Sequence, residues 1–250
     1  LGNGAYRFKI DATDTNGTAK HSADIGDTWF AYDTELPTVV LNLTAVDTQP
    51  IGTYRNAAFT IQGTVQDANG IASADISYDN GSSWVGITGG VTAGAGVSQG
   101  WIQGITVAGN NGTKTLKIRA TDSYGRIGYS ASHTVTLDDV DPAITPASLA
   151  TGYYDAQLSV SGTASDATSG VFAVEYSIDA NNNGTNDDAW LTATGTTSWF
   201  KSNIDSSGQD EGTRTVWFRA TDSAGNQTVD SRTFTVDHGN PELVVDAGFD

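Results

Sequence analysis

Residues 116–122 read Leu-Lys-Ile-Arg-Ala-Thr-Asp, and this stretch indicates the fold of the chain. Its apolar residues Leu116, Ile118 and Ala120 alternate with two basic residues. Successive side chains of a β-strand point to opposite faces, so a period of two is typical of an antiparallel strand with one buried face. The stretch therefore predicts a half-buried strand, and no window of the chain shows a sustained helical period.

The same pattern occurs three times without gaps. Phe-Lys-Ile-Asp-Ala-Thr-Asp occupies residues 8–14, and Val-Trp-Phe-Arg-Ala-Thr-Asp occupies residues 216–222. The final aspartates lie 108 and then 100 residues apart. A short alternating strand that ends in Asp follows each copy, and a Pro comes four residues later, as in Val-Thr-Leu-Asp at 135–138 with Pro142. Repetition at this spacing indicates tandem structural units.

The repeat register predicts two complete units, at residues 37–141 and 142–241. Residues 1–36 are expected to be the tail of a preceding unit, and residues 242–250 the first strand of a following one. Each complete unit reads as roughly seven short strands with frequent turns, which is typical of a sandwich of about 100 residues. The predicted fold class is all-β, with tandem immunoglobulin-like antiparallel β-sandwich domains.

Composition narrows the range of partners. The net charge is −17, and 25 Asp stand against 4 Glu. Such a charge makes nucleic acid and anionic lipid unsuitable partners, because both are negatively charged. Asp is preferred where a carboxylate caps a turn or reaches a cation on a short tether, so divalent cations are the more natural partner.

Several chemistries and locations are excluded by what the sequence lacks. Cys and Met are absent, which excludes disulfides, thiol catalysis and soft-metal sites. No apolar run approaches the roughly 18 residues of a membrane helix, so no membrane insertion is expected. The three histidines are isolated, and no nucleophile elbow or zinc motif is present. The sequence therefore predicts a protein that is not an enzyme.

A family resemblance rests on motifs in a fixed order. Gly-Thr at 63–64 precedes Asp67, Ser-Tyr-Asp-Asn-Gly-Ser-Ser-Trp occupies 77–84, and Arg-Ala-Thr-Asp-Ser occupies 119–123 before the strand–Asp–Pro step. This order resembles the bacterial immunoglobulin-like repeats of giant adhesins and other cell-surface proteins, over essentially the whole chain. The resemblance implies stalk or extender modules at an extracellular or cell-surface location. It also implies that Asp residues at domain junctions bind Ca²⁺, as they do in some members.

Acidic residues are expected to meet at the two joints between units. In an immunoglobulin-type sandwich the B–C and F–G loops lie at the pole where the chain enters, so they face the incoming linker. The residues expected together at the first joint are Asp33, Glu35, Asp67, Asn69 and Asp122. Those expected at the second joint are Asp138, Asp139, Asp141, Asp166 and Asp222.

Converging carboxylates would repel each other unless a cation lay among them. Ca²⁺ takes six to eight oxygen ligands and tolerates irregular geometry, so it is the predicted cofactor. The alternative is that these aspartates only stabilise turns, which Asp does by accepting hydrogen bonds from nearby backbone N–H groups.

A further calcium candidate is the stretch from residue 179 to residue 188. Its spacing of oxygen ligands followed by Gly184 reproduces the start of an EF-hand-type loop, although position twelve is Trp190 rather than Glu. The candidate ligands are Asp179, Asn181, Asn183 and Asp187. The alternative is a lengthened polar hairpin. The shorter stretch at 77–84 looks like the Asp-box hairpin of sialidases and many secreted β proteins, where it is a folding element.

The predicted function is that of a non-catalytic extender in a large extracellular protein. Its partners would be neighbouring immunoglobulin-like repeats of the same chain, and Ca²⁺ at the joints would stiffen the array. One alternative is a filament, sheath or lattice subunit that contacts other copies through exposed aromatics such as Trp217. Another is a carbohydrate-binding module that uses Trp residues as sugar platforms. The recurrence of Trp84 with Trp190 and of Trp101 with Trp199 favours core packing over a dedicated sugar site.

Overall fold

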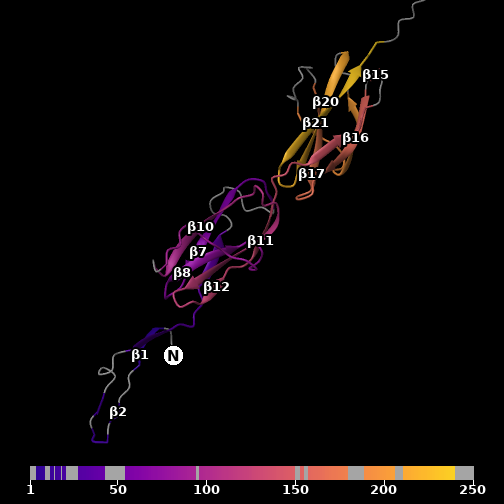
Figure 1. Cartoon of the computed structure of the whole chain (residues 1–250). Helices are drawn as coiled ribbons and strands as arrows, with labels where there is room; N and C mark the ends of the chain where they lie inside the picture. The colour runs from indigo at the N-terminus through magenta and orange to yellow at the C-terminus, as the bar shows by residue number, and fades with distance from the viewer. Residues whose placement is uncertain are drawn as a thin grey trace, which may run out of the picture. The chain divides into compact units, whose positions relative to one another are not determined.

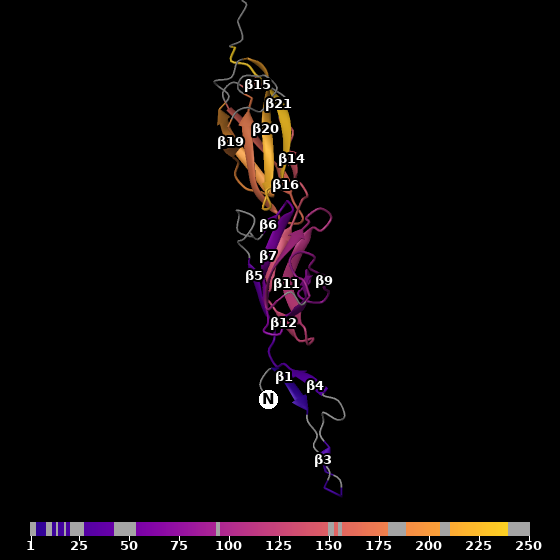
Figure 2. The same ribbon diagram turned by 90° about the vertical axis from the view of Figure 1, so that its left-hand side faces the viewer.

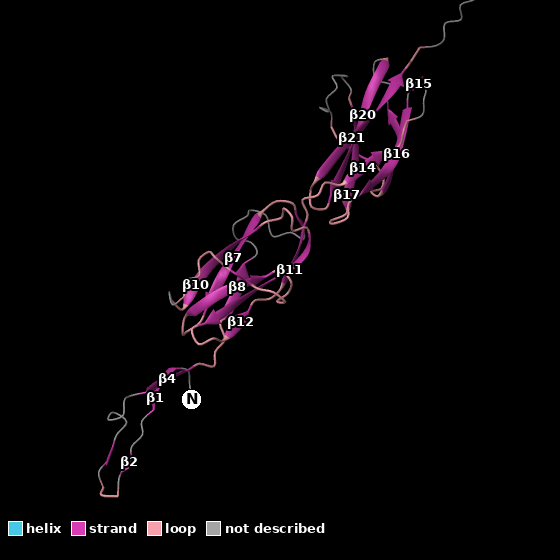
Figure 3. Ribbon diagram, viewed as in Figure 1, coloured by secondary structure: helices cyan, strands magenta, loops and turns pink. Residues whose placement is uncertain are grey.

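The computed structural model describes residues 4–8, 12–13, 15–17, 19–20, 28–42, 54–93, 96–149, 153–154, 157–179, 189–205 and 211–239. Every regular element among these residues is a β-strand (Figure 3). The predicted all-β fold class is therefore confirmed.

Backbone contacts divide the chain into two compact units. The first comprises residues 1–52, 59–105 and 114–135. The second comprises residues 53–58, 106–113 and 136–250. Each unit contains the main part of one two-sheet sandwich (Figure 1), and the second unit also includes strand residues 54–55, 112–113 and 136–137 of the first sandwich.

The N-terminal residues form two short antiparallel pairs. Strand β1 (Gly4–Phe8) pairs with β4 (Thr28–Tyr32). Strand β2 (Ala12–Thr13) pairs with β3 (Ala19–Lys20). The first copy of the repeated heptapeptide, at residues 8–14, falls largely outside the described residues.

The first sandwich has one sheet of three strands and one of six. The three-stranded sheet has the order β10-β7-β5 and consists of β5 (Thr38–Asn42), β7 (Phe59–Gln66) and β10 (Ser98–Ile105). The other sheet has the order β6-β13-β11-β8-β9, with β12 paired to β11. Its strands are β6 (Tyr54–Arg55), β8 (Ile71–Ser77), β9 (Val85–Gly86), β11 (Gly112–Asp122), β12 (Ile127–Tyr129) and β13 (His133–Leu137).

The second sandwich repeats this arrangement. One sheet has the order β14-β16-β19, and the other has the order β15-β21-β20-β17-β18. The strands are β14 (Ala143–Pro146), β15 (Tyr153–Tyr154), β16 (Gln157–Ser165), β17 (Val171–Ile178), β18 (Leu191–Thr192), β19 (Ser198–Asp205), β20 (Gly212–Asp222) and β21 (Gln227–Val236). Figure 2 labels strands of both sheets, β14, β16 and β19 from one and β15, β20 and β21 from the other.

In each sandwich the first two strands belong to different sheets. Strand β5 is antiparallel to β7, whereas β6 is parallel to β13. In the second sandwich β14 is antiparallel to β16, whereas β15 is parallel to β21. The shared topology identifies both as immunoglobulin-like sandwiches in tandem.

The core follows from the alternation in the sequence. Leu116, Ile118 and Ala120 of β11 are fully buried, while the residues between them are half-buried on the outer face. In the second sandwich Val216, Phe218 and Ala220 occupy the matching positions of β20 and are equally buried. A buried tryptophan lies in each core, Trp101 in the first and Trp199 in the second. Core packing of this tryptophan pair is therefore confirmed.

Candidate metal centres

Three aspartates far apart in the sequence come together in the first unit. Asp33 follows β4, Asp67 begins the turn between β7 and β8, and Asp122 ends β11. One carboxylate oxygen from each lies within 4.8 Å of the others. Asp67 and Asp122 are buried, and Asp33 is half-buried. Three carboxylates at this separation repel each other strongly in a partly desolvated site.

Local turn geometry explains why each loop presents its aspartate. Gly70 has φ of 87° and Gly125 has φ of 83°, a left-handed conformation that glycine adopts without a steric penalty. The loop after β11 is tied to the loop after β7, because Ser123 N donates to Gly70 O at 3.0 Å. This bond holds Asp122 beside Asp67.

One oxygen of each carboxylate caps its own turn. Asp33 Oδ1 accepts from Glu35 N at 3.0 Å, and Asp67 Oδ1 accepts from Asn69 N at 2.8 Å. Asp122 Oδ1 accepts from the N–H groups two and four residues later, at 2.7 and 2.9 Å. Turn stabilisation therefore accounts for these three oxygens.

The remaining oxygens are not explained by turn chemistry. Asp33 Oδ2 and Asp122 Oδ2 are buried, and neither has a hydrogen-bond partner among the described residues. Leaving a buried acceptor unsatisfied costs about 1–3 kcal/mol, and more when it is charged. Buried, unpartnered carboxylate oxygens at close range form the donor set that a hard divalent cation prefers. The residues of this cluster therefore fit Ca²⁺.

A second cluster has the same construction in the second unit. Asp138 follows β13, Asp166 begins the turn after β16, and Asp222 ends β20. One carboxylate oxygen from each again lies within 4.8 Å of the others. Ser223 N donates to Gly170 O at 2.9 Å, which ties the two loops as in the first unit.

In the second cluster, too, some carboxylate oxygens cap turns, while one buried oxygen has no hydrogen-bond partner among the described residues. Asp166 Oδ1 accepts from three backbone N–H groups of residues 168–170, at 3.1, 2.8 and 2.8 Å. Asp138 is fully buried, and its Oδ1 accepts from Val140 N at 3.1 Å. Asp138 Oδ2 is buried without a partner in the described part of the chain. This oxygen and its two neighbouring carboxylates fit a cation in the same way.

Two residues that the sequence analysis did not single out contact the linker aspartates. Arg126 Nη1 donates to Asp33 O at 2.6 Å. Asn226 Nδ2 donates to Asp138 O at 3.0 Å and to Asp222 Oδ2 at 2.7 Å. Their place four residues after the final Asp of the repeated heptapeptide is the signal that could have located them.

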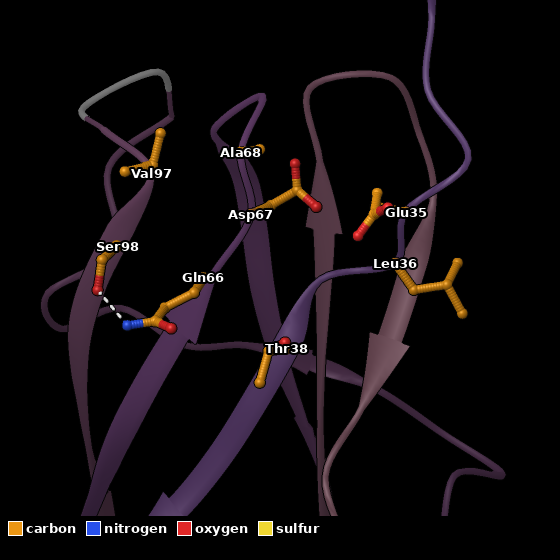
Figure 4. A pocket seen from close by; sticks show the side chains of 8 residues that line it. All are labelled: Glu35, Leu36, Thr38, Gln66, Asp67, Ala68, Val97 and Ser98. Atoms are coloured by element: carbon orange, nitrogen blue, oxygen red, sulfur yellow. Dashed lines mark hydrogen bonds between the residues drawn. The ribbon is translucent and has the colours of Figure 1, made fainter. Parts of the chain in front are cut away.

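Other predicted residues lie near the clusters without being part of them. Glu35 is exposed and lines, with Asp67, a groove of about 380 Å³ in the first unit. Figure 4 shows the Glu35 and Asp67 carboxyl groups turned toward each other across this groove. Asn69 contributes its backbone N–H to Asp67. Asp139 and Asp141 are both exposed, and neither belongs to the group of three carboxylates that includes Asp138.

The EF-hand-like stretch is described only at its beginning. Asp179 is fully buried, and its N–H donates to Thr215 O at 3.0 Å. Asn181, Asn183 and Asp187 lie outside the described residues, so the loop remains a prediction.

The shorter hairpin at 77–84 is held by its own side chains. Ser77 Oγ donates to Asp79 Oδ1 at 2.7 Å, and Ser83 Oγ donates to Asp79 Oδ2 at 2.6 Å. These bonds from Ser77 and Ser83 lower the pKa of Asp79 well below its ordinary value. Asn80 and Gly81 have φ of 59° and 99°, as a tight hairpin turn requires. The folding role expected of this motif accounts for all of these contacts.

The second recurring tryptophan pair is not part of the core. Trp84 and Trp190 are half-buried on the outer faces of the sandwiches. The guanidinium of Arg119 lies 4.7 Å from the centre of the Trp84 ring, and that of Arg219 lies 4.4 Å from the centre of the Trp190 ring. These are cation–π contacts, in which the guanidinium covers one face of the tryptophan ring. That face is therefore not open to a sugar. Core packing was therefore the wrong interpretation for this pair.

Comparisons with known proteins found no matching family model and no matching curated protein. Solved structures do show similarity. The tetra-tandem repeat in the extending region of a large adhesion protein has 20% identity and a TM-score of 0.38, with 95% of this chain and 58% of that chain covered. Domains A168–A170 of titin have 16% identity and a TM-score of 0.44, with 93% and 75% covered.

One enzyme also matches over part of the chain. The sulfane dehydrogenase SoxCD from Paracoccus pantotrophus has 20% identity and a TM-score of 0.29, with 47% of this chain and 27% of that chain covered. Similarity at these levels carries no information on ligand, partner or activity. Among the described residues, no helix is long and apolar enough to cross a membrane.

Proposed function

We propose that this chain is a non-catalytic extender segment of a large extracellular or cell-surface adhesin-like protein, stiffened by Ca²⁺ at its two aspartate clusters. The repeat boundaries at 37–141 and 142–241 are part of this proposal. The observation that supports it most directly is the set of buried carboxylate oxygens without hydrogen-bond partners among the described residues, Asp33 Oδ2, Asp122 Oδ2 and Asp138 Oδ2.

The mechanism follows from the positions of the three carboxylates in each cluster. One comes from a linker that ends in Pro, and two come from loops of a sandwich, after β7 and β11 in the first unit and after β16 and β20 in the second. A cation shared by all three would bind the linker to the loops. An ion that binds only this conformer increases its population by mass action. Calcium would thereby reduce the freedom of the linker without any new protein–protein contact.

The test measures thermal unfolding and small-angle scattering of the 250-residue chain in millimolar Ca²⁺ and in chelator. We expect calcium to raise the melting temperature and to increase the radius of gyration. The variant Asp138→Asn/Asp166→Asn should lose the part of this response that comes from the second cluster. The matched control Asp139→Asn/Asp141→Asn removes the same charge from exposed linker positions and should keep the response. Identical melting and scattering of the unmodified chain with and without Ca²⁺ would refute the proposal.

A specific observation favours one alternative, lateral assembly with other copies. Ile102 and Phe200 directly follow the buried tryptophans of the two cores, and their side chains are 43% and 52% exposed. Apolar residues exposed at equivalent positions in both sandwiches would suit a repeated side-to-side contact. Sedimentation of the chain over a range of concentrations tests this alternative, since Ile102→Ser/Phe200→Ser should abolish any association that is observed.

A further inference from the structure

The two clusters differ in charge at one equivalent position. Four residues after Asp122 the chain has Arg126, and four residues after Asp222 it has Asn226. The backbone N–H of each donates to the Oδ1 of its aspartate at 2.9 Å. Each side chain then reaches the carbonyl oxygen of the linker aspartate. The two side chains therefore have the same structural task, but only one is a cation.

Arg126 brings its positive charge to the first cluster. Its Nη1 bonds Asp33 O at 2.6 Å, and its Nε is buried with no partner among the described residues. The guanidinium carries a full positive charge and has no acceptor atom of its own. It offsets part of the carboxylate repulsion that would otherwise draw in a cation, and it repels a divalent ion at the same place.

Asn226 brings no positive charge to the second cluster. Its amide is neutral, and the oxygen that it contacts, Asp222 Oδ2, keeps a second lone pair for an ion. Exposed acidic residues flank both clusters, Glu35 at the first and Asp139 with Asp141 at the second. Solvent screens these exposed charges more than it screens the half-buried Arg126, which has a neutral counterpart in Asn226.

We propose that the second cluster is the tight calcium site of this chain and that Arg126 makes the first cluster a weak one. This inference rests on the proposed function, because it assigns different affinities to the two calcium sites. As calcium falls, the first cluster loses its ion before the second does. Arg126 keeps the emptied first cluster partly neutralised, whereas the emptied second cluster retains its full repulsion. For a divalent ion and a unit charge about 8 Å apart, Coulomb repulsion lowers the affinity about sixfold at the permittivity of water and by more in a partly buried site, so we expect a difference on the order of tenfold.

The test uses full-length proteins in which one cluster has been silenced. Asp33→Asn/Asp67→Asn leaves only the second cluster, and Asp138→Asn/Asp166→Asn leaves only the first. Asn keeps an oxygen that can cap each turn, so the loops are retained. Calorimetric titration with CaCl₂ in calcium-free buffer should give a Kd about tenfold lower for the protein that retains the second cluster.

Exchanging the residues at positions 126 and 226 then tests whether Arg126 causes the difference in calcium affinity. In the protein that retains the first cluster, Arg126→Asn should tighten calcium binding about tenfold, and in the other protein Asn226→Arg should weaken it similarly. Each substitution places a residue that the equivalent loop already accommodates. Lys117→Asn, in the first-cluster protein, removes the same unit of charge from the outer face of β11 and should leave the Kd unchanged.

The outcomes separate this inference from the proposed function. Equal affinities at the two clusters, or an Arg126→Asn variant with an unchanged Kd, would overturn the inference and leave calcium stiffening in place. An equal effect of Lys117→Asn would also overturn it, because net charge rather than position would then be the cause. Absence of calcium binding in every protein would overturn both.

Discussion

Replacement of Asp138 by Asn should change stability in opposite directions with and without calcium. Asp138 is fully buried, its Oδ1 accepts from Val140 N at 3.1 Å, and its Oδ2 has no partner among the described residues. In the Asp138→Asn variant the capping oxygen would remain while the charge disappears, so the substitution removes repulsion without removing the turn. The new amide group could also donate to the neighbouring carboxylates.

The size of the gain in chelator follows from the geometry of the cluster. Two carboxylates within 4.8 Å of each other repel by roughly 3.5 kcal/mol at an effective permittivity of about 20. Asp166 is only half-buried, so solvent screens part of this repulsion. We expect Asp138→Asn to raise the free energy of unfolding by about 1–3 kcal/mol in chelator.

In calcium, Asp138→Asn should instead lower the free energy of unfolding. An ion present at about 1,000 times its Kd stabilises the folded state by about 4.1 kcal/mol, and the variant would lose this contribution with its ligand, which leaves a net loss of about 1–3 kcal/mol. For a domain of about 100 residues this corresponds to a change in melting temperature on the order of 10 °C. The variant should therefore melt above the unmodified protein in chelator and below it in calcium.

The assay is urea or thermal unfolding of both proteins in chelator and in saturating Ca²⁺. Asp139→Asn is the matched control, because it removes the same charge from the adjacent exposed residue and should change little in either condition. If Asp138→Asn lowers stability equally in both conditions, Asp138 acts only as a turn cap, and the reasoning about a cation among these carboxylates is wrong.

Three further predictions concern the hairpin at residues 77–84 and the packing of the two sandwiches. The pKa of Asp79 is lowered in the folded protein, so its ionised form contributes stability at neutral pH that is lost as the pH falls below about 4. The difference in melting temperature between the unmodified protein and Asp79→Asn should therefore become smaller from about pH 5 to about pH 2. Trp199→Ala should cost about 3–5 kcal/mol in urea unfolding, since the ring is 1% exposed in the core. Gly162→Ala should be strongly destabilising, because its Cβ would lie 2.5 Å from both the Trp199 ring and a backbone carbonyl of β14, whereas Gly104→Ala meets nothing within 4 Å and should be tolerated in the same unfolding assay.

Much of the fold was predictable because its signals are local. The alternation in residues 116–122 reports which face of β11 is buried, since strand side chains change sides at every residue. Because the same alternation recurs at residues 216–222, it also predicts which face of β20 is buried. The positions of Asp67 and Asp122 at strand ends were predictable for the same reason, because each follows directly from where an alternating run stops.

Side-chain environments on the outer face were less predictable. Trp84 and Trp101 both recur in the second repeat, yet only Trp101 and its counterpart pack in the core. Trp84 lies near a turn, where the alternation has ended, so the sequence pattern does not assign it to a face. The stacking of Arg119 on its ring depends on two segments that are distant in the sequence.

Local patterns in the amino-acid sequence were sufficient to predict the strands, the repeat and the set of acidic residues from which a metal site could be built. Which of these acidic residues converge depends on how the strands and loops pack together. The linker offers Asp138, Asp139 and Asp141 in nearly adjacent positions, and the path of its backbone buries Asp138 while leaving the other two exposed. The contrast between Arg126 and Asn226 likewise has meaning only where their side chains meet linker carbonyls 93 and 88 residues away in the sequence. Local patterns report short-range geometry, whereas a site depends on contacts between segments that folding brings together.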